Sequence, residues 1–170
     1  DRIEPAEVVP GAARLGLPEG ARPIAPALNA AGERVGLVFL NSDFADAVGY
    51  SGKPIHIAVG MDPEGRISGL QLVAHDEPIV LIGIPEARVV EGMRSLVGLD
   101  VPALRAGRVP IPQVDVISGA TVTVLVMGDS VIRAAVEVLR ADRLAAPEAE
   151  EAPAADMRRE IAPDPAPEAR

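Results

Sequence analysis

A turn of small residues followed by a long apolar helix constrains this chain most. Ser118, Gly119 and Ala120 follow a short β-type run over 114–117 and precede a helical pattern from about Thr121 to Ala141. Gly119 permits a tight turn and a close approach to the backbone, and Ser118 or Thr121 can cap the helix. The helix has a wide apolar face in two stripes, Val124, Met127, Val131, Ala134, Val138 and Leu125, Gly128, Ile132, Ala135, Leu139.

The segments before this helix predict an antiparallel sheet. Residues 34–40 read as a buried strand, and residues 55–61 alternate between apolar and smaller or polar side chains. Residues 62–66, Asp-Pro-Glu-Gly-Arg, form a turn signal before a returning strand over 67–74. We therefore expect a hairpin over 54–75, a helix over 86–97, and an α+β fold in which helices pack on a twisted antiparallel sheet.

The chain divides by composition into three parts. Residues 1–32 are rich in Pro, Gly and Ala and predict an irregular N-terminal segment that contains at most one short helix or strand. Residues 33–144 form the folded domain, in which 99–108 is read as a connection. Residues 145–170 hold seven acidic residues against three arginines, together with five prolines, and predict a flexible acidic tail.

Charge and composition exclude several classes of protein. The net charge of -9 argues against nucleic acid or an anionic membrane surface as the main partner. Cys is absent, which excludes disulfides, iron–sulfur clusters and Cys-ligated zinc within these residues. No apolar run reaches the ~18 residues that span a bilayer, and the chain starts with Asp1, so we expect a processed product or a soluble piece of a longer protein.

Two stretches resemble a known family. Asp115-Val116-Ile117-Ser118-Gly119-Ala120-Thr121-Val122-Thr123 resembles the flavinylation motif of FMN-binding domains in the NqrC, RnfG and NosR families. His75-Asp76-Glu77-Pro78-Ile79-Val80-Leu81-Ile82-Gly83-Ile84-Pro85 is similar to the NosR and NirI form, whereas NqrC and RnfG carry a Glu-Thr-Pro-Gly type of sequence there. The match runs from roughly Gly49 to Leu139.

The resemblance implies a cofactor, a location and a role. In the family, FMN is joined by a phosphoester to the Thr after Gly-Ala, which corresponds to Thr121, and a flavin transferase adds it from FAD. NosR-type proteins are inner-membrane proteins of denitrification that hold this domain in the periplasm and support nitrous oxide reductase by electron transfer. The expected partners are thus the transferase, nitrous oxide reductase or its accessory redox proteins, and the rest of the membrane-anchored chain, with no nucleic acid. The domain would be an electron carrier rather than an independent enzyme.

Around Thr121, the motif residues have both functional and structural interpretations. Backbone N–H groups at Ser118, Gly119 and Ala120 can hold a phosphate, and a helix start favours an anion. Asp115 either caps the turn or is recognised by the transferase. Thr123 completes the motif.

Further candidates lie upstream. Glu77 and His75 either line the flavin or position the Thr121 loop, or they form a salt bridge or a surface loop without a functional role. Tyr50 can contact the flavin ring or pack in the core. Gly83 lets the backbone approach a flat ring, and Ile84 can contact it, unless both belong to a core strand. His56 and His75 alone do not make a metal site.

Three alternatives remain open. The domain can belong to an Rnf- or Nqr-type redox complex, against which the Glu77-Pro78-Ile79 form argues. It can be a sensory or assembly module in which flavin is structural or absent. It is a plain structural domain if Thr121 is never modified.

Overall fold

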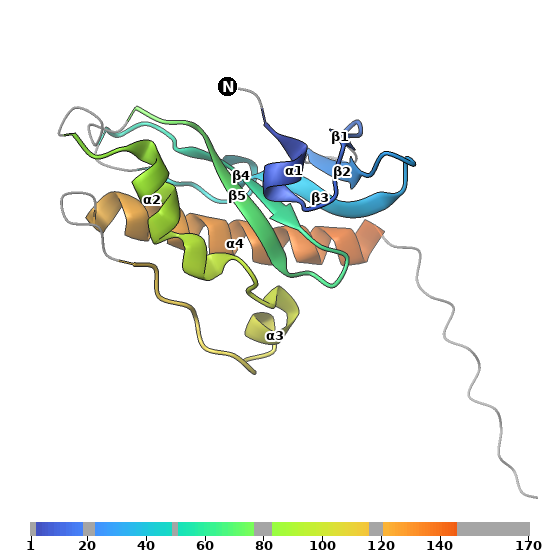
Figure 1. The fold of residues 1–170 in the computed structure, drawn as a ribbon. Helices are drawn as coiled ribbons and strands as arrows, with labels where there is room; N and C mark the ends of the chain where they lie inside the picture. The colour runs from blue at the N-terminus through green and yellow to red at the C-terminus, as the bar shows by residue number, and fades with distance from the viewer. Residues whose placement is uncertain (1–2, 19–22, 49–50, 77–82, 116–120, 146–170) are drawn as a thin grey trace, which may run out of the picture.

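The computed structural model describes residues 3–18, 23–48, 51–76, 83–115 and 121–145, of which 142–145 are described as backbone only. Figure 1 shows a sheet with one long helix along it and shorter helices around it. The strands are β1 (Arg14–Leu15), β2 (Ile24–Leu28), β3 (Arg34–Leu40), β4 (His56–Met61) and β5 (Ile67–Ala74). The helices are α1 (Pro5–Val8), α2 (Glu86–Gly92), α3 (Val101–Arg105) and α4 (Thr121–Ala145), with 3₁₀ turns η1 (Asn41–Asp43) and η2 (Arg94–Leu96).

The sheet is antiparallel throughout, and its strands lie in chain order. The β4–β5 hairpin forms as the alternating pattern predicts, and the turn residues close it. Gly65 has a φ of 84° and donates its N–H to the Asp62 carbonyl at 3.0 Å, and Asp62 Oδ1 accepts from the Arg66 N–H at 2.9 Å. The predicted α+β class is therefore confirmed.

The two faces of the sheet carry side chains of different size because successive residues of a strand point to opposite sides. Large apolar side chains point to the face that α4 covers, with contributions from α2 and the segment after it. These core residues include Leu37, Phe39, Ile57, Val59, Met61, Val89, Met93, Val124, Met127 and Val131. Burial of this apolar area holds α4 against the sheet.

The other face is lined by small residues because α1 approaches it closely. A Cβ added at Gly60 would lie 1.9 Å from the Val8 carbonyl oxygen, and one at Gly69 would lie 2.4 Å from that of Glu7. Ser68 Oγ donates to the Val8 oxygen at 2.6 Å. A second, smaller core forms here from Val8, Val9, Ala12, Ala27, Val38 and Ala58.

The N-terminal segment holds more regular structure than its composition indicates. Within 1–32, α1 covers the sheet and β1 and β2 extend it, so this part is not irregular. Pro26 is tolerated in β2 because its bond with Gly16 uses the Pro26 carbonyl, which accepts from the Gly16 N–H at 2.8 Å. This bond does not need the backbone N–H that proline lacks. The interpretation of 99–108 as a plain connection also missed α3, which Asp100 caps by accepting from the Ala103 N–H at 2.9 Å.

The predicted helix over 86–97 is shorter in the structure. It ends at Gly92, and η2 follows it. Gly is a weak helix former, and the Gly92 carbonyl accepts from the Asp115 N–H at 2.8 Å. A tertiary contact thus joins the helix end to the chain that leads into α4. The predicted acidic tail falls almost entirely outside the described residues.

Candidate functional site

The start of α4 presents Thr121 at one end of the domain (Figure 1). Thr121 is the first residue of the 25-residue helix, as the motif predicts, and it is half-buried. Its neighbour Val122 is exposed, whereas Thr123 is 1% exposed and points into the core. The hydroxyl-bearing residue at the surface of the motif helix is therefore Thr121.

A buried polar network fixes α4 against the sheet. Asn41, which is 0% exposed, donates from Nδ2 to Ser130 Oγ at 2.9 Å and to the Ile55 carbonyl at 3.1 Å, and its Oδ1 accepts from the Ile57 N–H at 2.7 Å. Ser130 Oγ donates in turn to the Ala45 carbonyl at 3.0 Å. These bonds join the end of β3, the start of β4 and the middle of α4. Sliding or rotation of the helix would break them, so they hold Thr121 in position.

The segment that leads into the motif is anchored from both sides. The Ser95 hydroxyl donates to the Gln113 carbonyl at 2.9 Å, and the Asp115 N–H donates to the Gly92 carbonyl at 2.8 Å. Val114 packs against Gly128 of α4 so closely that an added Cβ there would lie 2.7 Å from a Val114 methyl group. Val114 and Asp115, the described part of the expected β-type run, are not in a strand. The Asp115 side chain is exposed.

His75 and Glu86 pair near the far end of β5. His75 Nε2 lies 2.9 Å from Glu86 Oε1, with the His75 side chain 6% exposed. An ion pair between Lys53 and Asp76, 3.4 Å apart and mostly exposed, lies beside it in the chain. The partner of His75 in this contact is thus Glu86, the first residue of α2.

The two other upstream candidates differ from each other. Gly83 is exposed with a φ of 84°, has open space where a Cβ would be, and is not part of a strand. Ile84 is partly buried and packs against the main core. The predictions for Tyr50, Glu77, Ser118, Gly119 and Ala120 fall outside the described residues.

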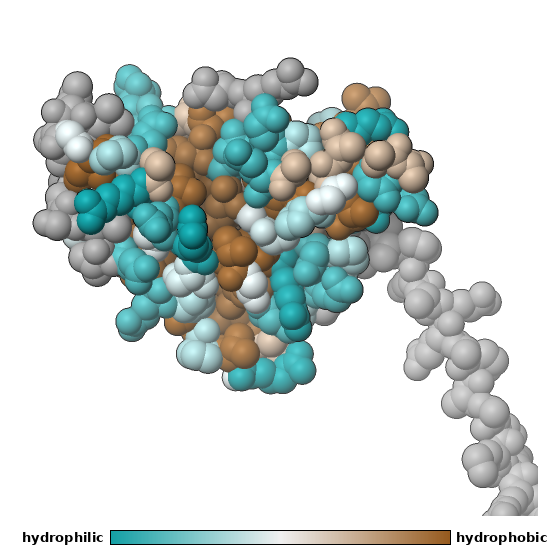
Figure 2. All heavy atoms as spheres, in the orientation of Figure 1, coloured by the Kyte–Doolittle hydropathy of each residue, from teal (hydrophilic) through white to brown (hydrophobic). Residues whose placement is uncertain are grey.

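Three hollows of the described surface lie away from Thr121. One of about 760 Å³ runs between the outer side of β5 and α2, where Figure 2 shows apolar groups between polar ones. Another of about 350 Å³ is lined by β3, the β4–β5 turn and the end of α4, and a third of about 420 Å³ by Phe44 and Arg133. Thr121 lines none of these three.

The start of α4 fits a phosphorylated cofactor. The first turn contains no acidic residue, and the first N–H groups of a helix lack intrahelical partners and attract an anion. Among the described residues, no cluster of three or more His, Asp or Glu could hold a metal, and no helix there is long and apolar enough to cross a bilayer.

The sequence interpretation missed the residues that position the helix. No pattern in the sequence assigned a role to Asn41 or to Ser130. The signal that could have identified Ser130 is that it is a polar residue among the buried positions of α4. The second predicted apolar stripe of the helix also included Leu125, which is not part of the buried face because it is 50% exposed.

A family model for the FMN-binding domain matches residues 49–136, which include the hairpin, the segment that leads into the motif, and the first four turns of α4. The chain belongs to the FMN-binding domain family. It is 38% identical over 144 residues to regulatory protein NosR of Pseudomonas aeruginosa, and the aligned region covers 79% of this chain and 19% of that protein. It is 40% identical over 107 residues to regulatory protein NosR of Stutzerimonas stutzeri, 61% of this chain and 15% of that protein.

A third relative extends the group. Protein NirI of Paracoccus denitrificans is 35% identical over 104 residues, 61% of this chain and 15% of that protein. This FMN-binding domain is thus homologous to parts of NosR and NirI. The chain spans less than a fifth of the length of each relative it matches.

Proposed function

We propose that this FMN-binding domain is a periplasmic electron carrier in a NosR-like membrane protein, with FMN joined to Thr121 by a phosphoester. The main support for this proposal is the position of Thr121, which lies within the family match. It is the half-exposed first residue of a long helix that is held firmly against the sheet, and the first turn of this helix has no acidic residue. The FMN supplies the redox chemistry. The chain supplies the tether, the N–H groups around the phosphate and a fixed helix.

Attachment requires a separate transferase. Thr121 Oγ would attack the FMN phosphorus of FAD, so that an Oγ–P bond forms, the P–O–P bond breaks and AMP leaves, while the hydroxyl proton passes to solvent or the transferase. The first turn of α4 (Thr, Val, Thr, Val) offers no base for that proton, so the base would belong to the transferase.

The relatives support the setting. Their names, together with the Glu77-Pro78-Ile79 form of the upstream stretch, favour a NosR or NirI chain over an Rnf or Nqr subunit. We propose that electrons pass through this domain to support nitrous oxide reductase in denitrification. The remaining part of a longer chain would anchor the domain to the inner membrane.

The test is the intact mass of the domain after export to the periplasm of a host that contains the transferase. Wild type should be heavier by one FMN less one water, and Thr121→Ser should also be modified, since it retains a hydroxyl. Thr121→Ala should have its bare mass. Ser68→Ala, which removes a hydroxyl that donates to the Val8 carbonyl and lies outside the motif, is the control for a folding defect and should still carry FMN. A bare wild-type mass with transferase shown to act on another substrate contradicts the proposal.

A regulatory role is the second candidate, because two relatives are named regulatory proteins. A reductive titration of the flavinylated domain separates the two. An electron carrier should be reduced and reoxidised reversibly at potentials between those of quinols and nitrous oxide reductase. A potential outside that interval favours the regulatory role.

A further inference from the structure

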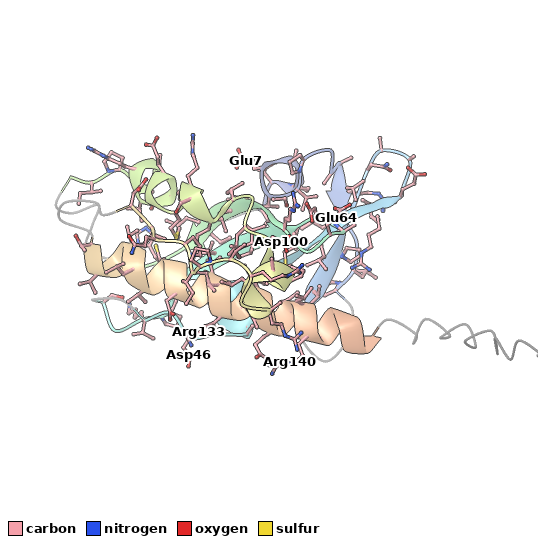
Figure 3. All side chains as sticks on the ribbon, turned by 90° about the horizontal axis from the view of Figure 1, so that it is seen from below. Glu7, Asp46, Glu64, Asp100, Arg133 and Arg140 are labelled. Carbon is pink, nitrogen blue, oxygen red and sulfur yellow. The ribbon has the colours of Figure 1, made fainter. Side chains whose placement is uncertain are left out.

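The outward face of α4 changes character along its length. Val122 and Leu125 are 43% and 50% exposed, so large apolar groups meet solvent over the first turns. Beyond them the same side carries charge: Asp129 and Arg133 form an exposed pair at 2.8 Å. Figure 3 shows Arg133 and Arg140 projecting on that side of the helix, with Asp46 beside Arg133. The apolar part is therefore confined to the end that carries Thr121.

Helix geometry places this apolar part next to the attachment point. Leu125 lies one turn after Thr121, and Asp129 one further turn along, so that the apolar face extends roughly 12 Å from Thr121 before charge begins. A ring joined to Thr121 through phosphate and a ribityl chain can fold back over this length. Exposed aliphatic side chains here would gain from being covered, at about 25 cal/mol per Å² of apolar area.

The two aromatic side chains in the described part of the chain, Phe39 and Phe44, pack against each other. Phe39 is 2% exposed, and its ring packs edge-on against Phe44 with centroids 5.6 Å apart. Neither ring belongs to the first turns of α4. Aliphatic groups are thus the apolar surface that the described residues offer beside Thr121.

We propose that Val122 and Leu125 form an apolar ledge that supports one face of the isoalloxazine ring of the FMN on Thr121. This inference rests on the proposed attachment. The ledge shields that face from water and favours a ring lying along the helix over one projecting into solvent. Charge at Asp129 and Arg133 limits the ledge at its far end.

The experiment compares Val122→Ser, Leu125→Ser and the double variant with Val97→Ser. Val97 is the matched control because it is also a valine and also 43% exposed, but it lies after η2. All proteins are exported with the transferase, and intact mass first establishes that FMN is attached. Iodide quenching of flavin fluorescence and the visible absorption bands then measure the exposure of the ring, with circular dichroism as the check on folding.

The ledge predicts that the double variant carries FMN but is quenched more readily, with the ratio of docked to undocked ring reduced roughly tenfold. Each single variant should show part of this effect, and Val97→Ser none. Unchanged quenching in the double variant overturns the ledge, as does an equal change in Val97→Ser. Loss of attachment in folded ledge variants also overturns it, since the face would then serve the transferase. A wild type without FMN is a different result, which refutes the proposed attachment itself.

Discussion

Replacing Asn41 with alanine should destabilise the domain more than the removal of so few atoms suggests. The Asn41 amide makes three hydrogen bonds at a position with 0% exposure. Its loss leaves the Ile57 N–H without its acceptor inside the core, which costs about 1–3 kcal/mol. The Ile55 carbonyl also loses the Asn41 donor. With the cavity left behind, we expect a loss of about 3 kcal/mol.

Urea unfolding of the domain measures this loss. For a slope of about 2 kcal/mol per molar urea, the midpoint should fall by about 1.5 M. Ser130→Ala, which leaves Asn41 two of its three bonds, should cost about 1 kcal/mol. The double variant should be more stable than the sum of the single losses predicts, because the two side chains share one bond.

Asn29→Ala is the matched control. The Asn29 side chain makes two hydrogen bonds, both with Glu33 at 2.9 Å, in a solvent-exposed turn. Removing this side chain should therefore cost less than about 1 kcal/mol of stability. An Asn41→Ala variant as stable as Asn29→Ala would refute the view that this network holds α4 in place.

Three further predictions concern packing and charge. Gly60→Ala should lower the free energy of unfolding by about 3 kcal/mol in urea, because the new methyl group meets the Val8 carbonyl at 1.9 Å; a loss below about 0.5 kcal/mol would contradict this. Gly128→Ala should slow FMN attachment in a timed mass assay, since its methyl group displaces Val114 ahead of the motif, while its cost in stability, about 1 kcal/mol, is partly offset by helix propensity; an unchanged rate would contradict it. Arg133→Ala should change the thermal midpoint by less than about 3 °C, because its ion pair is exposed; a larger fall would show that its bond to the Asp46 carbonyl matters more.

Local patterns predicted the elements whose signals lie within a single segment. The bounds of β3 and β5 agree with the expected strands 34–40 and 67–74, and the Asp62–Arg66 turn closes the hairpin. The start of α4 at Thr121 also follows from its motif. In each case the hydrophobic period or the turn residues suffice, because neighbouring residues determine the geometry.

Long-range contacts determined what the sequence did not reveal. Asn41 and Ser130 are 89 residues apart and form one bond, and no local pattern connects them. β2 was not predicted because it lies in a segment rich in Pro and Gly, yet it pairs with β3 over its whole length. The end of α2 at Gly92 likewise reflects its bond to Asp115. Which apolar face of α4 is covered depends on the sheet beneath it, and for this reason the exposure of Leu125 was not predicted.

The most direct test of the central claim is to locate the flavin on the chain. Wild-type domain exported with the transferase is digested with trypsin, and the 109–133 peptide is fragmented in a mass spectrometer. That peptide contains every hydroxyl residue of the motif, Ser118, Thr121 and Thr123, as well as Ser130. The account predicts that fragments containing Thr121 carry the mass of FMN less water. An unmodified peptide, or FMN on any of the other three residues, would contradict it.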